Sequence, residues 1–329
     1  MKRRLVDLLA CPACHSDLVL HTDTTDGSEI ITGRLTCSGC AAEFPVEGGI
    51  PRFTATHSRG HDATARAFGF QWKRYSTLEA RYRTQFLDWI RPVEPAFFEG
   101  RTVLEGGCGK GRHTALAAEF GVRDIVALDL SEAAEVAYAN TGQHPAVHIV
   151  QADLNHPPVK RVFDYAFSIG VLHHLPDPER GFHALVSRVL PGGHISAWVY
   201  GREGNGWIVN LVSPVRENVT ARMPHQLLRP LANVATVPLF LAARLLYAPT
   251  AGTALGRHLP YGEYVRYIAP YPFAEQRTIV FDHLVAPVAF YLRRDEFAGW
   301  FERAALEDVR IEHHNANSWR GFGRVPESG

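Results

Sequence analysis

Short apolar runs recur between amphipathic segments through the middle of the chain. Five of these runs have the length and the apolar content expected of buried strands: 102–105, 124–129, 148–153, 163–169 and 194–200. Helix-forming segments separate them, as at 112–120 and 181–190. Alternating strands and helices predict a doubly wound sheet, with its binding site at the carboxyl ends of the strands.

The pattern changes on both sides of this block. Charged and aromatic residues precede it, and apolar helical segments follow it, before a helix at 294–305 and an antiparallel strand pair at 309–314 and 319–325. We therefore expect five parts: a small N-terminal domain (1–55), a helical lead-in (56–100), the sheet core (101–200), a helical lid over the site (201–290) and a helix and strand pair that complete the sheet (291–329).

The composition is that of a globular protein with no dominant charge. The chain has 329 residues, 46% of them hydrophobic, and its 34 Lys and Arg balance 34 Asp and Glu. Proteins that bind the phosphate backbone usually carry a clustered basic face, so nucleic acid is not the expected partner. The N-terminal apolar stretch is interrupted by Asp7 and leads into Cys11, unlike a signal peptide. We expect a soluble, cytoplasmic protein.

Four cysteines form two pairs with the spacing of a metal site. Cys11 and Cys14 form one C-x-x-C turn, and Cys37 and Cys40 form another after 22 intervening residues. Such turns place four thiolates around one tetrahedral ion, for which Zn²⁺ is expected. Because four thiolates fill every coordination position, the zinc should be structural. Its binding supplies folding free energy that a domain of about 50 residues lacks.

A glycine-rich turn follows the first strand of the central block. It reads E-G-G-C-G-K-G from Glu105 to Gly111, and its glycines allow the backbone to approach a ligand closely. Dehydrogenases instead use G-x-G-x-x-G to seat a pyrophosphate, which an acidic residue before the turn would repel. Glu105 suits a ligand that carries an ammonium and a sulfonium. Asp129 ends the next strand, where it can accept hydrogen bonds from both hydroxyls of a ribose.

Successive motifs of this block resemble those of class I S-adenosylmethionine (SAM) methyltransferases. The resemblance covers about 100 residues in the right order: 103–112, Asp129, 151–154, 168–178 and 190–193. It implies an α/β fold with a Rossmann-like, seven-stranded sheet, mostly parallel with an antiparallel last strand. It also implies SAM as the cofactor.

The resemblance assigns the cofactor contacts residue by residue. They are Glu105, Gly107, Cys108, Gly109 and Gly111 for the methionine end, Asp129 and Leu130 for the ribose, Asp153 and Leu154 for the adenine, and Ile169 and Gly170 near the cofactor amino group. Cys108 stands where the family often has cysteine, so we interpret it as a packing residue and not as a nucleophile.

The N-terminal part resembles a second family. The sequence 4–14, continued by 44–53, is similar to the zinc-ribbon family that includes the activator subunit of eukaryotic tRNA, rRNA and release-factor methyltransferases. In that family the ribbon docks on a separate catalytic chain, whereas here it is fused to one. From this resemblance we expect a protein partner at the ribbon.

Methyl transfer to a hydroxyl benefits from a base, and two histidines follow the fourth strand. His173 and His174 are the candidates, although their motif is widespread in the family across different substrates, which favours a structural role. The sequence contains no Asn-Pro-Pro-Tyr after the fourth strand, the signature associated with amino-group methylation of adenine or glutamine. We therefore expect a small-molecule acceptor, methylated at oxygen or carbon.

The lid segment combines apolar stretches with isolated arginines. The longest stretch, 234–247, includes Pro238 and Arg244 and is shorter than the ~20 residues that cross a bilayer. It suits a lipid-like acceptor with an anionic group or a peripheral membrane contact, or else a cap that packs on the sheet. Two other functions remain open: an rRNA or tRNA methyltransferase that binds its substrate through the ribbon, and a non-catalytic SAM-binding adaptor.

Overall fold

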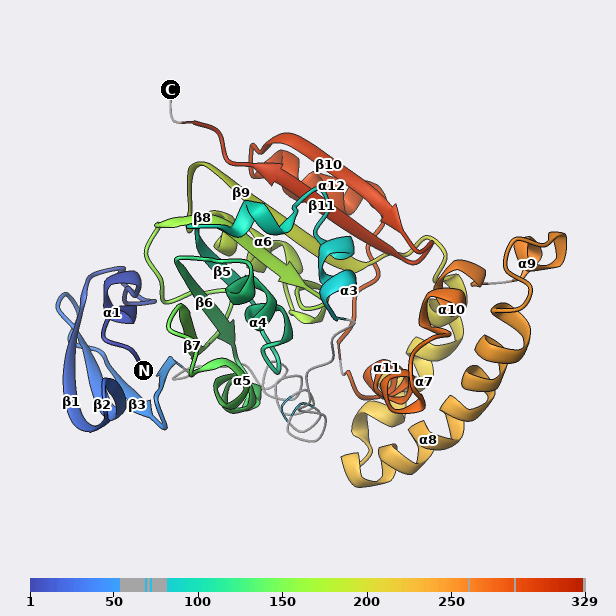
Figure 1. The fold of residues 1–329 in the computed structure, drawn as a ribbon, viewed down its shortest axis with the longest axis horizontal. Helices are drawn as coiled ribbons and strands as arrows, with labels where there is room; N and C mark the ends of the chain where they lie inside the picture. The colour runs from blue at the N-terminus through green and yellow to red at the C-terminus, as the bar shows by residue number, and fades with distance from the viewer. Residues whose placement is uncertain (54–68, 70–71, 73–81, 260, 287, 328–329) are drawn as a thin grey trace.

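The computed structural model of the chain describes residues 1–53, 69, 72, 82–259, 261–286 and 288–327. Three bodies follow one another along its longest axis: the N-terminal ribbon, a central domain built on a sheet, and a group of helices that forms the lid (Figure 1). The chain passes through them in order and then returns to the central domain for its last helix and two strands.

The central sheet has the topology that the sequence predicted. Its strands lie in the order β7-β6-β5-β8-β9-β11-β10, and the first five are parallel. They are β5 (Thr102–Gly106), β6 (Asp124–Asp129), β7 (Val147–Ala152), β8 (Phe163–Ile169) and β9 (Val189–Tyr200). The strand β11 (Ser318–Arg324) is antiparallel to both β9 and β10 (Glu307–His314). The predicted Rossmann-like sheet with an antiparallel last strand is confirmed.

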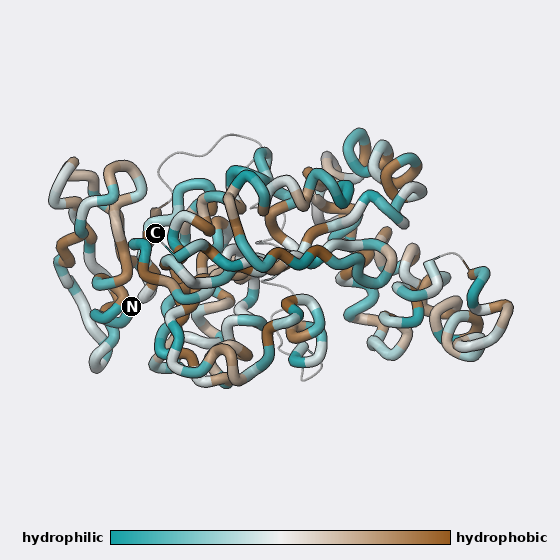
Figure 2. The backbone as a smooth tube through the Cα atoms, turned by 90° about the horizontal axis from the view of Figure 1, so that it is seen from above, coloured by the Kyte–Doolittle hydropathy of each residue, from teal (hydrophilic) through white to brown (hydrophobic). Residues whose placement is uncertain are grey.

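Helices cover both faces of this sheet, and each face has its own apolar core. The helices α3 (Tyr82–Trp89), α4 (Arg112–Glu119) and α5 (Ala133–Thr141) pack on one face, and α6 (Pro178–Val186) and α12 (Arg294–Arg303) pack on the other. Asp177 caps α6 by accepting a hydrogen bond from the Arg180 amide, and Pro178 fits its first turn. In Figure 2 the most hydrophobic stretches run through the middle of this domain.

The N-terminal ribbon is a four-stranded antiparallel sheet with one short helix. Its elements are α1 (Leu5–Leu8), β1 (Leu18–Asp26), β2 (Glu29–Cys37), β3 (Glu43–Glu47) and β4 (Ile50–Phe53). Both cysteine pairs lie at the same end of this sheet, because β1 begins shortly after the first pair and β2 ends within the second.

The ribbon and the central domain share one continuous sheet. The strand β4 pairs in parallel with β7, with Arg52 opposite Gln151 and Phe53 opposite Ala152, so that eleven strands form a single sheet. An ion pair 2.6 Å long between Arg4 and Asp124 adds to the contact. The sequence predicted the ribbon as a separate small domain and gave no sign of this pairing.

The lid is built from helices that follow β9. They are η3 (Ile208–Val212), α7 (Ser213–Asn218), η4 (Thr220–Arg222), α8 (His225–Ala242), η5 (Ala243–Tyr247), α9 (Ala254–His258), α10 (Gly262–Ile268) and α11 (Phe273–Val285). Leu228 and Ala232 of α8 pack against Phe281 and Val285 of α11 and form a small core separate from those of the sheet.

One helix among the described residues is long and apolar enough to cross a membrane by length and composition. It covers Leu227–Tyr247, 21 residues with a mean hydropathy of 1.3, and 17% of its most apolar window is buried. The apolar segment 234–247, expected to be too short to cross a bilayer, belongs to this longer helix, because α8 continues directly into η5. Pro230 and Pro238 lie inside α8 and do not end it; the helix curves visibly in Figure 1.

Only part of the predicted lead-in at 56–100 can be compared with the structure. The helix α3 and the short helix η1 (Pro95–Phe98) fall within it. Residues 56–68, 70–71 and 73–81 of the same prediction lie outside the described residues, as do residues 54–55 of the predicted N-terminal domain.

Candidate functional site

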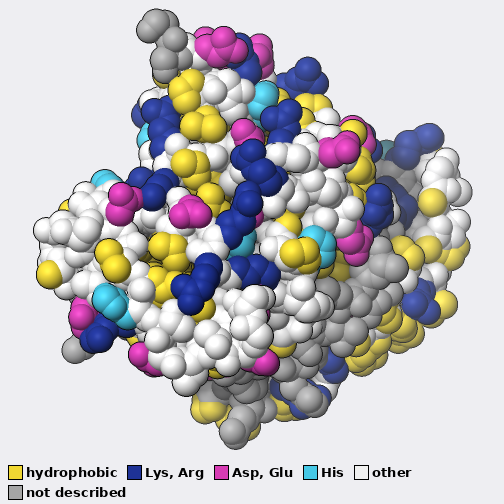
Figure 3. Space-filling model, turned by 60° about the vertical axis from the view of Figure 1, so that its left-hand side comes forward, with side chains coloured by type: hydrophobic (Ala, Val, Ile, Leu, Met, Phe, Trp, Pro, Cys, Tyr) yellow, Lys and Arg dark blue, Asp and Glu magenta, His cyan; other side chains and the backbone are white. Residues whose placement is uncertain are grey.

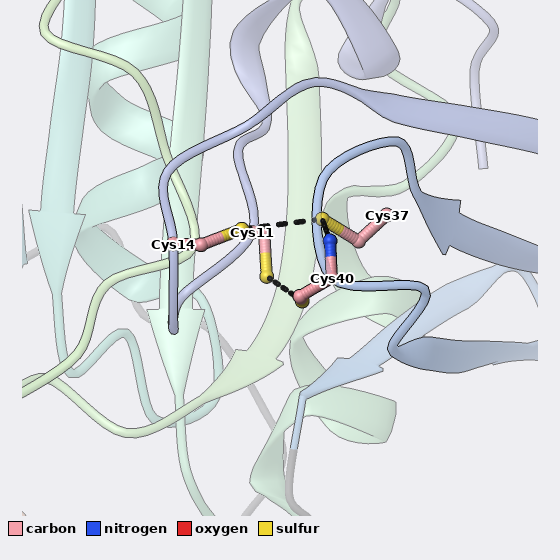
Figure 4. Close-up of side chains that lie close together, drawn as sticks. All are labelled: Cys11, Cys14, Cys37 and Cys40. Atoms are coloured by element: carbon pink, nitrogen blue, oxygen red, sulfur yellow. Dashed lines mark hydrogen bonds between the residues drawn. The ribbon is translucent and has the colours of Figure 1, made fainter.

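The four paired cysteines come together at one point of the ribbon (Figure 4). Their sulfur atoms all lie within 4.8 Å of one another; Cys11 and Cys40 are 3.7 Å apart, and Cys14 and Cys37 are 3.4 Å apart. Four zinc–sulfur bonds of about 2.3 Å in a tetrahedron place the sulfur atoms about 3.8 Å apart. This separation is far longer than the sulfur–sulfur bond of a disulfide. The cluster therefore fits a structural zinc ion, as predicted.

A cavity lies at the carboxyl ends of the parallel strands, between the sheet and the lid. Its sheet side includes Gly107 and Gly109 of the glycine turn, together with Asp129, Asp153 and Gly170. Cys108, Leu130, Leu154 and Ile169, which the resemblance also assigned to the cofactor, line the same cavity. Gly111 is not part of the lining; its φ of +81° lets the chain enter α4 from the turn.

Asp129 is held in place at the cavity by the glycine turn and by its own loop. Its Oδ2 accepts a hydrogen bond of 2.8 Å from the Gly109 amide, and its Oδ1 accepts hydrogen bonds from the Ser131 amide and hydroxyl, at 2.9 and 2.6 Å. Burial raises the pKa of this carboxyl group, and the three hydrogen bonds oppose the rise. The carboxylate thus holds the glycine turn and the end of β6 in a fixed position relative to one another.

Glu105 occupies a different place from the one expected of a direct cofactor contact. It is 1% exposed, beneath the turn and outside the cavity lining, and Thr114 donates a hydrogen bond to its Oε2. Its Oε1 has no hydrogen-bond partner among the described residues. Burial raises the pKa of Glu105 to about 8, so the group is mostly protonated at neutral pH. The Oε1 atom lies 3.6 Å from Nδ1 of His113. Its place below the turn fits a cationic group bound above the turn, and the contact itself stays a prediction.

Asp153 lies just after β7, on the side of the cavity that the resemblance assigns to adenine. Its Oδ1 accepts hydrogen bonds from the Asn155 backbone amide at 2.9 Å and from the Asn155 side chain at 3.2 Å. Gly170, which follows β8, has a φ of +73°, and its amide donates to the Trp198 carbonyl. Asp129 and Asp153 therefore give the sheet side of the cavity two acidic groups. This pair suits a ligand with a ribose and an adenine amino group.

The two candidate histidines differ in their access to the cavity. Both belong to the short helix η2 (Leu172–His174), but only His174 is part of the cavity lining. His173 is fully buried behind it, with its ring 3.9 Å from that of Tyr200, and neither of its ring nitrogens has a hydrogen-bond partner among the described residues. The geometry thus gives His173 a packing role and leaves His174 as the candidate base.

The tautomer of His174 follows from its hydrogen bond. Its Nδ1 lies 2.7 Å from the carbonyl oxygen of Val288, which can only accept, so Nδ1 carries the proton and Nε2 has the lone pair. Burial lowers the pKa of His174 to about 4, although the Val288 hydrogen bond opposes this, and the guanidinium of Arg216 lowers it further. His174 is therefore neutral at physiological pH.

The lid supplies the other wall of the cavity, mostly with residues that the sequence analysis did not select as site residues. They are Tyr261, Tyr264, Tyr267, Tyr271, Asp282, His283 and Tyr291, joined by Tyr200 from the end of β9. The hydroxyl oxygens of Tyr261, Tyr267 and Tyr291 are buried and make no hydrogen bond of normal geometry with the described residues, although each lies near a polar side chain: Asn317, Gln85 and Arg216, respectively. The spacing of the first four tyrosines is a detectable signal, whereas nothing local to 282–291 marks a site.

Gly107 is the position of the turn where a side chain is least tolerated. Its φ is +83°, and a Cβ there would lie 2.3 Å from a methyl group of Val171, another residue of the cavity wall. We expect Gly107→Ala to lower the free energy of unfolding by about 2–3 kcal/mol and to weaken SAM binding, as measured by denaturation and calorimetry.

Gly100→Ala is the matched control for this prediction. Gly100 also has a positive φ, +68°, but nothing lies within 4 Å of its Cβ position. Gly100→Ala should lower the free energy of unfolding by about 1 kcal/mol, from backbone strain alone, and should bind SAM normally. Equal effects of the two substitutions would show that close approach to Val171 is unimportant.

Two parts of the chain match known protein families. Residues 104–197 match the model of a methyltransferase domain, and residues 2–49 match that of Trm112p-like proteins. The chain therefore carries a methyltransferase domain behind a Trm112p-like ribbon, and both predicted resemblances are confirmed.

Curated relatives match part of the chain. An uncharacterized protein of Synechococcus is 33% identical over 36% of this chain and 32% of its own length. A tRNA U34 carboxymethyltransferase of Idiomarina loihiensis is 30% identical over 29% of this chain and 32% of its own length. A ubiquinone biosynthesis O-methyltransferase of Photorhabdus laumondii is 28% identical over 34% of this chain and 48% of its own length. The chain thus spans about a third to a half of these relatives.

Solved structures with a similar arrangement include a complex between the Haloferax volcanii Trm112 methyltransferase activator and a putative methyltransferase. That match has a TM-score of 0.45 and 14% identity, and it covers 83% of this chain and 100% of the other. A putative SAM-dependent methyltransferase from Listeria monocytogenes has a TM-score of 0.32 and 24% identity, over 37% of this chain and 56% of its own.

Proposed function

We propose that this protein transfers the methyl group of SAM to oxygen or carbon of a small molecule bound under the lid. One observation carries the proposal: a single cavity joins the glycine turn, Asp129 and Asp153 to the tyrosine wall of the lid. A cofactor held by the sheet and an acceptor held by the lid would therefore meet in one space. SAM supplies a methyl group already activated by its sulfonium, so the protein's main task is to align the acceptor and exclude water.

The residues on the sheet side fit SAM better than a dinucleotide. Asp129 offers a fixed carboxylate for a ribose, and Asp153 offers a second carboxylate further along the same edge. Glu105 lies under the turn with one oxygen that accepts no hydrogen bond from the described residues, and a cofactor ammonium there would lower the raised pKa of this carboxyl group.

His174 is the residue we assign to proton removal from a hydroxyl acceptor. The Val288 carbonyl orients its ring and fixes the proton on Nδ1, which leaves Nε2 to accept a proton. Since burial keeps the ring neutral, it is in the form that a base requires at any pH well above 4. A carbon acceptor that is already nucleophilic would need His174 only for orientation.

The lid favours a small acceptor with an apolar body and oxygen-bearing groups. Its aromatic rings provide apolar walls, and the buried hydroxyls of Tyr261, Tyr267 and Tyr291 are available as hydrogen-bond donors to such groups. The residues of this wall come from three separate segments, which converge on the acceptor region from the lid side.

RNA methylation is the second candidate. Some relatives carry the name tRNA U34 carboxymethyltransferase, and Figure 3 shows several Lys and Arg side chains in a line across the face turned forward there. A basic line of this kind could contact phosphates. However, a base would have to leave its strand to reach the enclosed cavity, and the overall charge is balanced. A non-catalytic adaptor remains the third candidate.

The first test is calorimetric titration of the zinc-loaded protein with SAM and, separately, with NADH. We expect micromolar binding of SAM and no binding of NADH, because the turn and its acidic residues suit a cation and repel a pyrophosphate. Tritium from labelled SAM should then appear in a small-molecule extract and not in total tRNA. Absence of SAM binding would overturn the proposal and favour the adaptor, and label in tRNA would favour the RNA enzyme.

The role of His174 is tested in the same transfer assay. His174→Gln should bind SAM normally but transfer the methyl group to a hydroxyl acceptor roughly a hundredfold more slowly. His21→Gln makes the same chemical change at an exposed site of the ribbon, outside the cavity lining, and should be neutral. A normal rate in His174→Gln would remove this residue from the mechanism.

A further inference from the structure

The outer side of the lid carries a continuous stripe of exposed aliphatic side chains. Its members are Leu227, Leu231, Val234, Leu241 and Leu245, spaced four, three, seven and four residues apart, so they share one face of the continuous helix α8–η5. Val234 is 70% exposed and Leu245 is 73% exposed. The helix forms the outer rim of the lid, far from the ribbon (Figure 1).

The opposite side of the same helix is already used for packing. Leu228 and Ala232 contact Phe281 and Val285 of α11, and Ala243 packs with a second cluster of the lid. This packing fixes the rotation of the helix about its axis. The stripe is therefore presented outward by the fold, and no described part of the chain covers it.

The charged side chains of the helix that carries the stripe all have one sign. The helix from His225 to Tyr247 contains no acidic residue, and its two charged side chains are Arg229 and Arg244. Between 218 and 274 there are five arginines and one acid, Glu263. Arg244 and Arg257 are exposed, and the Arg244 guanidinium lies over the Phe240 ring, 4.4 Å from its centroid.

We propose that this stripe docks the lid on an anionic lipid bilayer surface. An apolar helical face flanked only by arginines lies flat in the headgroup region, with its aliphatic side chains among the acyl chains and its cations beside lipid phosphates. The helix does not cross the bilayer, because its other face is packed against α11 and the rest of the lid. The stripe itself lacks the aromatic residues that protein interfaces favour, so lipid fits it better than a protein partner.

The test is sedimentation of the full-length, zinc-loaded protein with lipid vesicles. The protein should bind vesicles that contain phosphatidylglycerol and bind phosphatidylcholine vesicles much less. Leu241→Gln combined with Leu245→Gln should reduce binding at least about tenfold, because each leucine loses several buried methylene equivalents. Arg244→Gln should reduce it roughly fivefold and lessen its salt dependence.

Val19→Gln provides the matched control. Val19 is an aliphatic residue of the ribbon, 51% exposed, and its substitution should leave vesicle binding unchanged. Circular dichroism and SAM titration check that the lid variants are folded, since neither leucine lines the cavity. Failure of the wild type to bind anionic vesicles, or equal binding by the double variant, would overturn the proposal. So would a concentration-dependent dimer that the double variant abolishes, which would assign the stripe to a second copy of the chain.

Discussion

Removal of zinc should unfold the ribbon and lower the thermal midpoint of the protein by roughly 5–10 °C. Structural zinc contributes about 10–16 kcal/mol in isolated zinc fingers, and a loss of about 5 kcal/mol corresponds to a shift of about 7 °C in a chain of this length. Here the effect extends beyond the ribbon, because β4 pairs with β7 and Arg4 pairs with the buried Asp124. Differential scanning calorimetry with and without a chelator measures the shift.

Two cysteine variants make this experiment specific. Cys37→Ser removes a buried ligand, so it should have the lower midpoint already and respond little to the chelator. Cys108→Ala removes the one cysteine outside the cluster and should keep the full response. Superimposable unfolding curves before and after confirmed zinc loss would refute a structural role for the metal.

Asp129→Ala should weaken SAM binding by at least about a hundredfold. Two hydrogen bonds from a ribose to a carboxylate contribute about 1.5–3 kcal/mol each. The substitution also releases the Gly109 and Ser131 amides that Asp129 now holds, so the turn loses its fixed position. Isothermal titration calorimetry with SAM measures the affinity directly.

Two further variants separate charge from shape at this position. Asp129→Asn keeps the size and one acceptor oxygen, so it should lie between the wild type and the alanine variant. Glu119→Ala removes an exposed carboxylate at the end of α4 and should bind SAM normally. An unchanged affinity in Asp129→Ala would exclude this carboxylate from the cofactor site.

The elements that the sequence predicted are those specified by local signals. Apolar runs of strand length, the glycines of the turn and the acids that end the strands are all readable within a few residues. Their order then determines a doubly wound sheet, because parallel crossovers have one hand. The positions of Asp129 and Asp153 at the cavity follow from that topology.

The features that were missed depend on contacts between distant segments. The pairing of β4 with β7 joins residues about 100 positions apart, and two paired positions leave no periodic signature. Asp282, His283 and Tyr291 reach the cavity only because the end of α11 meets the end of β9, where His283 stacks on Tyr200. Glu105 was expected to face the ligand, but in a strand buried on both faces an acidic residue can point into the core, where Thr114 meets it.

The length of α8 was misjudged for a related reason. Prolines usually end a helix, and Pro238 divides the apolar stretch in the sequence. Packing of α8 along α11 supports the helix on one side, so it tolerates two prolines and continues into η5. Tertiary contacts here override local preference.

The shared eleven-stranded sheet also determines which strand edges are open to association with another chain. Without the ribbon, β7 would present unpaired backbone groups of a fully buried, apolar parallel strand, a template for association with another chain. With the ribbon in place, the outermost strands are β1, with Asp23 and Asp26 near its end, and β10, with four charged residues in its first six. Fusion of the two domains thus replaces the apolar outer strand β7 by the polar outer strand β1. A chain that loses its zinc would be prone to aggregate before it loses its fold.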